Sequence, residues 1–496
     1  MGFTTFDGVI IVLYLIGIAM FGMMMGGRQA SVKDYFISEK TIPWWAVCIT
    51  IVATETSALT FLSLPGIAWA GSMVFLQLAL GYILGRIFVA VVLIPRYFEG
   101  ESYTAYTILE KYFGSAIRRT ASITFMLTRL FADGVRLYTT AIPLALLFQR
   151  FEILPELSAT SMYVLSIALL TTLTLVYVFV GGIRAVIWTD VLQWTVYVFG
   201  AVVSIVVLLK LIPLSVPELF STLLASGKLQ VVDAFPEGTW SALLTEPYSL
   251  LGGVVGGMVL SIASHGTDQI IVQRVLAAGH PKPAKKAMIL SGGVVFVQFA
   301  LFLFVGALLW KFDPSPTLTA NEVFASFILN YLPTGLSGLI VAGVLAAAMS
   351  TLSSSISALG SSTMLDIILP LRRTALSPDR ALKWSRKISI VWACLLLLVA
   401  TLFIGTPQAV VELALSIASF TYGGLLGLFV LGIFARHIST RAVLSGFAIG
   451  IIGNGLIILY TPLAWIWYTL SGVLLTIATA RIASILLPAK APESKR

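Results

Sequence analysis

A hydroxyl-rich run inside a long apolar stretch has the residue types needed to bind a small hard cation. Residues 346–355 read Ala-Ala-Ala-Met-Ser-Thr-Leu-Ser-Ser-Ser. On a helix, four of them fall on one face at positions i, i+3, i+4 and i+7: Ala347, Ser350, Thr351 and Ser354. Hydroxyls and a free backbone carbonyl are oxygen ligands that suit sodium. Alternatively, these small residues only allow close helix packing and bond to their own carbonyls.

Two other apolar stretches are interrupted by polar residues. Residues 53–57 read Ala-Thr-Glu-Thr-Ser in the middle of one stretch, and residues 261–269 include serine, histidine, glycine, threonine and aspartate in another. Polar residues and glycine at membrane depth favour local unwinding of a helix. Two such broken helices predict a solute and ion site near the middle of the bilayer.

The elements that position these residues must be membrane helices. The chain has 496 residues, of which 58% are hydrophobic and 11% charged, with a mean hydropathy of +0.99. This composition excludes a water-soluble fold and predicts an all-α integral membrane protein. The net charge of +9 does not indicate a nucleic-acid partner, because the basic residues gather in short connections between apolar spans. Cys48 and Cys394 lie far apart in apolar stretches, which argues against a disulfide framework or a zinc site.

Hydropathy predicts thirteen transmembrane helices. They fall at about 5–25, 42–70, 74–96, 120–148, 157–180, 186–212, 247–275, 284–311, 336–366, 384–404, 408–435, 442–460 and 463–487. Residues 1–7 contain no Lys or Arg, so the first segment is expected to be a retained helix and not a signal peptide. The polar tail after Pro488 is expected to be disordered.

Basic residues predict the orientation of the chain in the membrane. Taking alternate connections, one side holds most Lys and Arg residues, among them Arg118, Arg184 and Arg274. The other side holds only Arg150, Lys210, Lys228 and Lys311. The positive-inside rule then places the amino terminus outside and the carboxyl terminus in the cytoplasm.

The predicted helices divide into two sets of five. Helices two to six and seven to eleven each begin with an interrupted helix, and an odd number of spans makes such a repeat inverted across the membrane. The expected units are residues 1–41 (first helix and loop), 42–212 (first repeat), 247–435 (second repeat) and 436–496 (two accessory helices and tail).

Several ordered motifs resemble those of the sodium/solute symporter (SSS) family, including its bacterial sodium/sugar, sodium/proline and sodium/sialic acid symporters. They are the alanine-rich run ending in Ser350-Thr351, the 53–60 break followed by Phe-Leu-Ser-Leu-Pro-Gly, Ile187-Trp-Thr-Asp190, and Thr267-Asp-Gln-Ile-Ile-Val-Gln-Arg274. The resemblance covers most of the chain. It implies a LeuT-type five-plus-five inverted repeat with broken helices 2 and 7.

The same resemblance implies where sodium binds. The first site would use the carbonyls of Ala53, Thr56 and Ala347 and the hydroxyls of Ser350 and Thr351. Some members have a second site, which here would consist of Asp190 with Ser350, Ser353 and Ser354. Alternatively, Asp190 only caps the sixth helix near the cytoplasm. One or two sodium ions are therefore expected as the coupling ions.

The resemblance also nominates residues that line the solute pocket. They are Glu55, Ser57, Thr60, Gln77, Ser261, His265 and Asp268. Glu55 departs from the family, whose members more often have a neutral hydroxyl or amide there. An intramembrane carboxylate is costly unless it is paired or functional. Glu55 is therefore expected to bind a cationic or hydroxylated solute, accept a proton or pair with an internal arginine. His265 is expected to be a packing residue, a ligand or a proton relay.

Partners for Glu55 are expected on the fourth helix, where Arg129, Asp133 and Arg136 are spaced i, i+4 and i+7. These three residues could also form a ladder of their own that needs no solute. The carboxylate-binding arginine of sialic-acid-type relatives lies on this helix, but its register falls on Asp133 or Gly134 here. Arg136 remains a candidate solute ligand.

These observations predict an inner-membrane symporter that imports a small polar organic solute with sodium by alternating access. The solute is expected to be a sugar, a carboxylate or an amino-acid-like molecule. The only other partner expected is the lipid bilayer, with no obligate protein partner. Proton coupling is the main alternative, and a transporter-like sensor or a channel are others. No nucleophile–base pair or metal-ligand cluster in the sequence indicates an enzyme.

Overall fold

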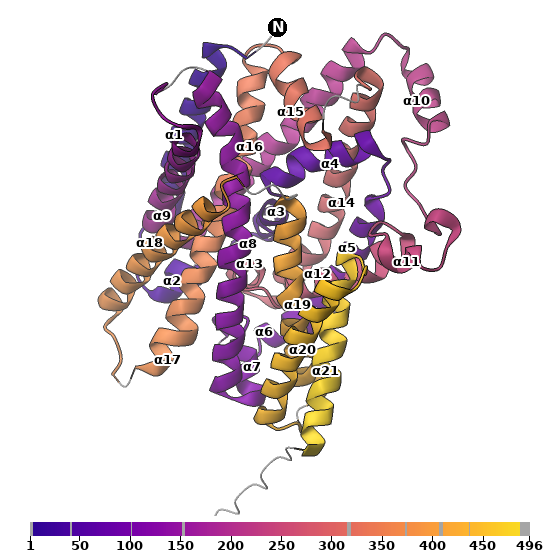
Figure 1. Ribbon diagram of the computed structural model, residues 1–496. Coiled ribbons are helices and arrows are strands. Elements are labelled where there is room, and N and C mark those ends of the chain that lie inside the picture. Colours follow the sequence, from indigo (N-terminus) through magenta and orange to yellow (C-terminus); the bar gives the residue numbers. More distant parts are fainter. Residues whose placement is uncertain are drawn as a thin grey trace, which may run out of the picture.

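The chain folds into a bundle of long helices (Figure 1). The computed structural model describes residues 3–39, 42–100, 102–150, 154–314, 319–372, 374–405, 410–435 and 437–486, and the tail after Pro488 lies outside them. Every regular element in these ranges is helical. The expectation of an all-α membrane protein is confirmed.

The first half of the bundle contains the helices up to α9. They are α1 (Thr5–Gly26), α2 (Val32–Ile37), α3 (Trp44–Glu55), α4 (Ala58–Ala70), α5 (Leu76–Phe88), α6 (Ile94–Tyr97), α7 (Thr107–Phe113), α8 (Ser115–Arg150) and α9 (Ala159–Leu211). A π-helical turn, η1 (Val89–Leu93), joins α5 to α6 without a break in the span.

The second half begins with short elements, namely α10 (Val216–Ala225), η2 (Pro236–Gly238), α11 (Ala242–Thr245) and the π-helical turn η3 (Gly252–Gly256). The spans follow as α12 (Gly257–Gly266), α13 (Gln269–Ala277), α14 (Pro281–Phe312), α16 (Leu336–Ser362), α18 (Pro378–Leu402), α19 (Val410–Phe434), α20 (Thr440–Tyr460) and α21 (Tyr468–Leu486). Between or beside them lie α15 (Ala320–Asn330), η4 (Thr363–Ile368), α17 (Leu369–Leu371) and η5 (Trp465–Trp467).

The thirteen expected spans can be traced in this order. In the described part of the chain, 9 helices are long and apolar enough to cross a membrane. One of them, α9, supplies two spans, because its 53 residues would reach about 80 Å as one straight helix. Its backbone leaves the helical conformation at Gly182, where φ is 57° and an added Cβ would lie 2.5 Å from the carbonyl oxygen of Tyr35. The more polar α8 and the pairs α3–α4 and α12–α13 complete the set.

Two spans are broken, as expected, but over shorter segments than the polar residues indicated. The first break consists of Thr56 and Ser57, whose extended backbone separates α3 from α4. The second lies at Thr267 and Asp268, between α12 and α13. Glu55 and residues 261–266 remain helical, because each break needs only two residues to leave helical geometry.

The span that carries the hydroxyl-rich run lies in the interior of the bundle. Helix α16 packs against α1, α8, α9 and α18, and nearly all of its residues are buried. Serine, alanine and glycine allow these neighbours to approach closely. The hairpin of α20 and α21 packs against α19 at one edge (Figure 1).

Two basic residues assigned to connections lie elsewhere. Arg274 is fully buried in α13, and Arg118 is 8% exposed in α8, where its Nε lies 2.8 Å from Oδ1 of Asp366. The assignment of these two residues to loops from the sequence was wrong. Hydropathy treats a charged residue as part of a loop, even when its charge is neutralised by a partner inside the bundle.

Candidate functional site

A cavity of about 190 Å³ lies where the two broken helices meet. Its lining comes from α3, α4, α5, α8, α12, α13, α14, α16 and α19. Apart from tyrosine and tryptophan, the polar and charged residues that line it are Thr54, Glu55, Ser57, Thr60, Ser63, Arg129, Arg136, Ser264, His265, Thr351 and Ser419. The volume fits a small polar solute.

Glu55, at the end of α3, is bound by an arginine that the sequence did not single out. Its Oε2 accepts a hydrogen bond from Nη2 of Arg86 on α5, and Nη1 of Arg86 donates to the Ser291 hydroxyl at 2.9 Å. Arg86 is fully buried, while the Glu55 side chain is 16% exposed toward the cavity. The expected partner on the fourth helix was therefore wrong, since the ion pair joins α3 to α5.

His265 lies beside this ion pair. Its Nε2 is 3.7 Å from Oε2 of Glu55, too far for a hydrogen bond, and has no other partner among the described residues. Its Nδ1 lies 2.9 Å from the Ser264 hydroxyl. The imidazole is 3% exposed and lines the cavity. A buried polar atom without a partner is costly, so a bound group that hydrogen-bonds to Nε2 would be favoured.

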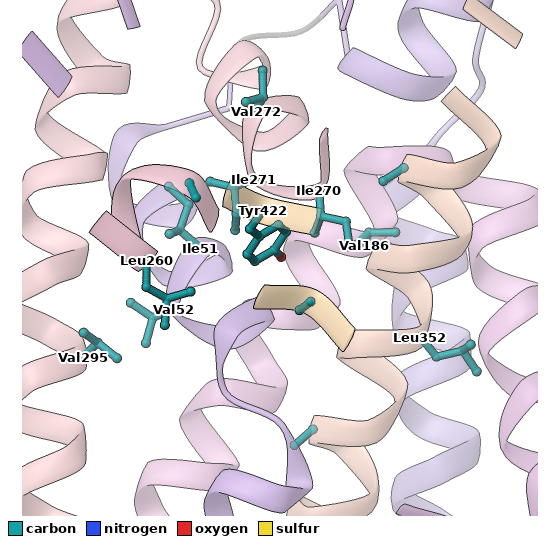
Figure 2. Close-up of a cluster of buried hydrophobic side chains, with 14 of the residues drawn as sticks. Ile51, Val52, Val186, Leu260, Ile270, Ile271, Val272, Val295, Leu352 and Tyr422 are labelled. Atoms are coloured by element: carbon teal, nitrogen blue, oxygen red, sulfur yellow. The ribbon is translucent and has the colours of Figure 1, made fainter. Parts of the chain in front are cut away.

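The other charged part of the cavity lies on α8. Arg129 donates to Asp268 from Nε and Nη2, at 2.9 and 2.5 Å, and to the hydroxyl of Tyr422 at 2.6 Å. Asp133 is shared by Arg129 and Arg136, whose Nη1 atoms each lie 3.4 Å away. Figure 2 shows the Tyr422 ring beside apolar side chains of α13 that also line the cavity.

The structure brings five of the eight nominated solute residues to the cavity: Glu55, Ser57, Thr60, His265 and Arg136. The other three have structural contacts and are absent from its lining. Gln77 bonds to the backbone of Tyr248 and Asp233, at 2.7 and 3.1 Å. Ser261 donates to the carbonyl of Tyr82 at 3.1 Å, where α12 crosses α5. Asp268 caps α13 by accepting the Ile270 amide at 2.8 Å, and it also accepts hydrogen bonds from Arg129.

The cavity extends toward the membrane side on which α1 begins. That end is lined by Phe75 at the start of α5, Tyr248 before η3 and Trp465 before α21. Each of these residues lies on that side of the membrane because the span that follows it runs toward the opposite side. Lys228, in the loop after α10, donates to the carbonyls of Trp69 and Gly71 at 2.7 and 2.8 Å. Its cation therefore lies at the C-terminal end of α4, a favourable place for positive charge, and partial burial lowers its pKa.

A second cavity of about 10 Å³, close to the space of one water molecule, adjoins the nominated first sodium site. It is lined by Ala53, Thr56, Gln193, Trp194, Tyr197, Ala347 and Ser350. Four of the five nominated residues therefore surround one space, between the end of α3 and the middle of α16. The fifth, Thr351, lines the larger cavity, and its hydroxyl donates to the Ala347 carbonyl at 3.2 Å.

Hydrogen bonds orient the hydroxyls around this small cavity. Ser350 donates to Oδ1 of Asp190 at 2.6 Å, which leaves its oxygen lone pairs free to coordinate a cation. Thr56 donates to the Val52 carbonyl and accepts from Nε2 of Gln298, both at 2.8 Å. Gln298 itself accepts from Trp194 at 2.6 Å. Such an arrangement of neutral oxygens suits a monovalent hard cation.

Asp190 is fully buried inside α9, so its interpretation as an interfacial cap was wrong. Its Oδ2 lies 3.0 Å from Nη2 of Arg274, and the side chains of Asp190 and Arg274 are each 0% exposed. Thr50 also donates to Oδ2. The nominated Ser353 and Ser354 donate to the carbonyl of Ser350, at 2.9 and 2.7 Å.

Sequence reasoning missed Arg86, Arg274 and Gln298. The signal for the two arginines was present, because a charged residue inside an apolar span is expected to be paired or functional. Gln298 gave a weaker signal, since one amide in the apolar run of α14 does not reveal which helix it faces. In the part of the chain that the structure describes, no group of three or more His, Cys, Asp or Glu side chains could hold a metal.

Comparison with known proteins shows the family to which the chain belongs. The sequence profile of the sodium:solute symporter family matches residues 35–450, so the chain belongs to that family. It is a sodium-coupled transporter of a small solute and not an enzyme.

Among its relatives is the sodium/sialic acid symporter SiaT of Proteus mirabilis, 27% identical over 88% of this chain and 86% of the relative. The sodium/sialic acid symporter NanT of Aliivibrio fischeri is 26% identical over 96% and 92%. A solved structure of a substrate-bound, outward-open Na⁺-coupled sialic acid symporter has a TM-score of 0.84 at 25% identity, over 98% of this chain and 99% of that one. The fold expected from the resemblance is confirmed.

Proposed function

We propose that this chain transports a small hydroxylated carboxylate together with sodium, and that Arg136 binds the carboxylate. Arg136 lines the cavity and its guanidinium makes one long contact, 3.4 Å to Asp133, with no other hydrogen bond among the described residues. A guanidinium has five donors in a planar fork that matches a carboxylate. Arg129 is a poorer candidate, because Asp268 and Tyr422 already use its donors.

The hydroxyl groups of the solute would bind at the other charged cluster, formed by Glu55, Arg86 and His265. Arg86 neutralises Glu55, so this cluster favours a neutral donor over a cation. Oε1 of Glu55 has no hydrogen bond in the described structure, and Nε2 of His265 has none either. A hydroxyl can donate to a carboxylate and also hydrogen-bond to an imidazole nitrogen, as these two groups require.

The similarity to two sodium/sialic acid symporters supports this solute class, because a sialic acid carries one carboxylate and several hydroxyls. Their identity with this chain, 27% and 26%, leaves room for a different solute of the same chemistry. We therefore propose a class of solute, the small hydroxylated carboxylates, whose carboxylate would bind Arg136 and whose hydroxyls would bind Glu55.

Sodium would bind at the small cavity between α3 and α16, with Ala53, Thr56, Ala347, Ser350 and Thr351 as ligands. Supporting this are the co-facial hydroxyls and the break at Thr56, which ends α3 and leaves carbonyls without helical partners. The large and small cavities share the end of α3, so sodium binding there would order the residues that contact solute.

Alternating access would move the two repeats, residues 42–212 and 247–435, relative to each other about the end of α3, which the two cavities share. We place the amino terminus outside and the carboxyl terminus in the cytoplasm of the inner membrane, on the basis of the lysine and arginine distribution. In that orientation the cavity faces outward, ready to take up solute for import.

The experiment is thermal unfolding of the purified full chain, in sodium or choline chloride at fixed pH, with matched solutes. We expect N-acetylneuraminic acid or gluconate to raise the unfolding midpoint only in sodium, and glucose to have no effect. Arg136→Gln should lose the solute response and keep the sodium response, while Arg119→Gln on the same helix should keep both. Equal stabilisation in choline would argue for proton coupling, and a normal solute response in Arg136→Gln would refute the carboxylate assignment.

A further inference from the structure

Two arginines lie close to the end of α1, one where α9 bends at Gly182 and one near the start of α18. The guanidinium of Arg184 lies beside Gly27, because a Cβ added to that glycine would be 4.0 Å from its Nη1. Arg386 of α18 donates from Nη2 to Oε1 of Gln29 at 3.2 Å. Both guanidinium groups therefore lie against the short segment that follows α1.

Neither arginine uses all of its hydrogen-bond donors. Arg184 is half-buried, and its Nε is buried without a partner among the described residues. Arg386 is also half-buried, and its Nε likewise has no partner there. The Arg386 guanidinium lies over the Phe179 ring, 5.5 Å from its centroid, which fixes its plane and leaves its N–H edge free. A buried donor without a partner is costly, so a group that accepts from these nitrogens would be favoured.

The acceptors near this segment have other partners. Nε2 of Gln29 donates to the two carbonyls that end α1, at 3.3 and 2.6 Å. Asp34 accepts two backbone amides, at 3.3 and 3.1 Å, and Glu39 accepts the Ser31 hydroxyl at 2.7 Å. The ion pairs in the described part of the chain use other arginines. The two guanidinium groups are therefore positive charges without a paired carboxylate.

Tryptophan side chains place these arginines at the level of lipid headgroups. Trp188 lies one turn after Arg184 on α9, and its ring contacts that of Trp45, with centroids 5.5 Å apart. Trp45, in the first turn of α3, is 43% exposed. Tryptophan is enriched where the hydrocarbon core of a membrane meets water. Arg184 is therefore at the depth of phosphate groups in the leaflet on the side where α1 ends.

Exposed apolar side chains lead from the arginines toward the middle of the membrane. They are Met20 and Met24 of α1, Val176 and Val180 of α9, and Ile390 of α18. Helices α1 and α18 both pack on α9, and the three helices lie at one edge of the bundle (Figure 1). Such a surface suits acyl chains, whereas a soluble anion would gain nothing from it.

We propose that Arg184 and Arg386 bind the phosphodiester group of an anionic phospholipid, whose acyl chains lie against α1, α9 and α18. A guanidinium can bind phosphate oxygens through two N–H groups at once, and the headgroup supplies the negative charge that both side chains lack. The positive-inside rule alone accounts for exposed basic residues on this side, such as Lys282 and Arg441. It does not account for half-buried arginines whose Nε atoms have no partner in the described structure. The inference is independent of sodium coupling and of the solute.

The test is thermal unfolding of the purified full chain in an uncharged detergent, at fixed ionic strength and with added lipid. We expect dioleoyl phosphatidylglycerol to raise the unfolding midpoint well above its value in dioleoyl phosphatidylcholine, which has the same acyl chains and a zwitterionic headgroup. Inorganic phosphate should leave the midpoint unchanged. Equal stabilisation by the two lipids, or an equal shift with inorganic phosphate, would overturn the lipid site.

Substitutions assign the effect to residues. The double variant Arg184→Gln with Arg386→Gln should lose most of the shift produced by phosphatidylglycerol. Its matched control, Lys282→Gln with Arg441→Gln, removes two exposed positive charges from the same side of the membrane and should keep the shift. An equal loss in both double variants would indicate a general effect of charge and refute the site. If the first double variant does not fold, the two single variants take its place, and a full shift in both would refute the site.

Discussion

Arginine side chains near the solute cavity are each in contact with a carboxylate. Arg86 contacts Glu55, Arg129 contacts Asp268, and Arg136 contacts Asp133. The first two pairs are close and connect different helices, while the third is longer and leaves most of its guanidinium free. Pairing makes intramembrane charge tolerable, and the weakly paired member is the one available to a solute.

Replacing Thr351 with alanine tests the first sodium site. Thr351 lines the larger cavity, and its hydroxyl donates to the carbonyl of Ala347, a residue that lines the small cavity, at 3.2 Å. Loss of one oxygen ligand, worth about 1 kcal/mol, should weaken sodium affinity about five-fold with folding intact. The measurement is a sodium titration of thermal unfolding. Thr171→Ala removes a similar buried hydroxyl, bonded to the Ile167 carbonyl at 2.7 Å, and should leave the titration unchanged. An unaltered titration in Thr351→Ala would remove the residue from the site.

Replacing Glu55 with glutamine tests the ion pair beside the cavity. Because Arg86 is fully buried, the substitution leaves its charge without a counter-charge, and breaking a buried pair costs about 3–5 kcal/mol. We therefore expect Glu55→Gln to unfold at a much lower temperature. The double variant Glu55→Gln with Arg86→Met should recover most of that loss.

The double variant also separates stability from binding. If Glu55 contacts solute through Oε1, the recovered protein should respond to sodium but be stabilised much less by solute than the original chain. Normal solute stabilisation in the double variant would restrict Glu55 to a structural role. A Glu55→Gln protein as stable as the original would instead contradict the assignment of Arg86 as its partner.

Among the helices, the half-helix α4 determines much of the shape of the cavity. It begins at the break, lines the cavity and packs on α14. Its backbone passes so close to α14 that a Cβ added to Gly306 would lie 2.0 Å from the Pro65 carbonyl oxygen. On its other side, a Cβ on Gly66 would lie 2.0 Å from the Ala320 carbonyl oxygen of α15. Glycine is therefore required at two positions that hold α4 against its neighbours beside the cavity.

Gly306→Ala should displace α4 from α14 and destabilise the protein by about 1–3 kcal/mol or more, since backbone atoms cannot move aside as a side chain can. Solute-dependent stabilisation should fall with it, because Ser57, Thr60 and Ser63 reach the cavity from this segment. Thermal unfolding with and without solute measures both effects. Gly293→Ala, in the same helix with nothing within 4 Å of the added Cβ, is the control and should be neutral or slightly stabilising. A neutral Gly306→Ala would contradict this packing.

The proposed direction of the whole molecule in the membrane rests on the distribution of charge. Connections on the side where α1 ends carry most of the basic residues, including the lysine- and arginine-rich segment 372–387. The cavity extends toward the opposite side, on which α1 begins. The positive-inside rule therefore predicts a chain whose solute cavity faces the outside.

Cysteine labelling tests this orientation in a background where Cys48 and Cys394 are replaced by serine. Ser226→Cys, in the exposed loop after α10, should react with a membrane-impermeant maleimide in spheroplasts. Ala375→Cys, exposed between α17 and α18, should react only after the membrane is opened. The opposite pattern would invert the topology and with it the direction of the cavity.

Much of this protein follows from its sequence, because the bilayer makes local composition decisive. Apolar runs had to be spans, and polar residues inside two of them had to mark breaks, since lipid cannot satisfy backbone groups that a helix leaves free. The co-facial hydroxyls of α16 followed from helical periodicity, and motif spacing indicated the family before any contact was known.

Only the tertiary structure decided which charges pair. Glu55 and Arg86 are 31 residues apart, and Asp190 and Arg274 are 84 apart, on helices whose facing sides no local period reveals. Sequence reasoning therefore sought a partner for Glu55 on α8 and assigned Arg274 to a loop. It nominated Gln77, Ser261 and Asp268 as solute ligands although the fold gives each a structural bond. A side chain's chemistry is local, but its partner depends on how the helices pack, and that packing is a property of the whole chain.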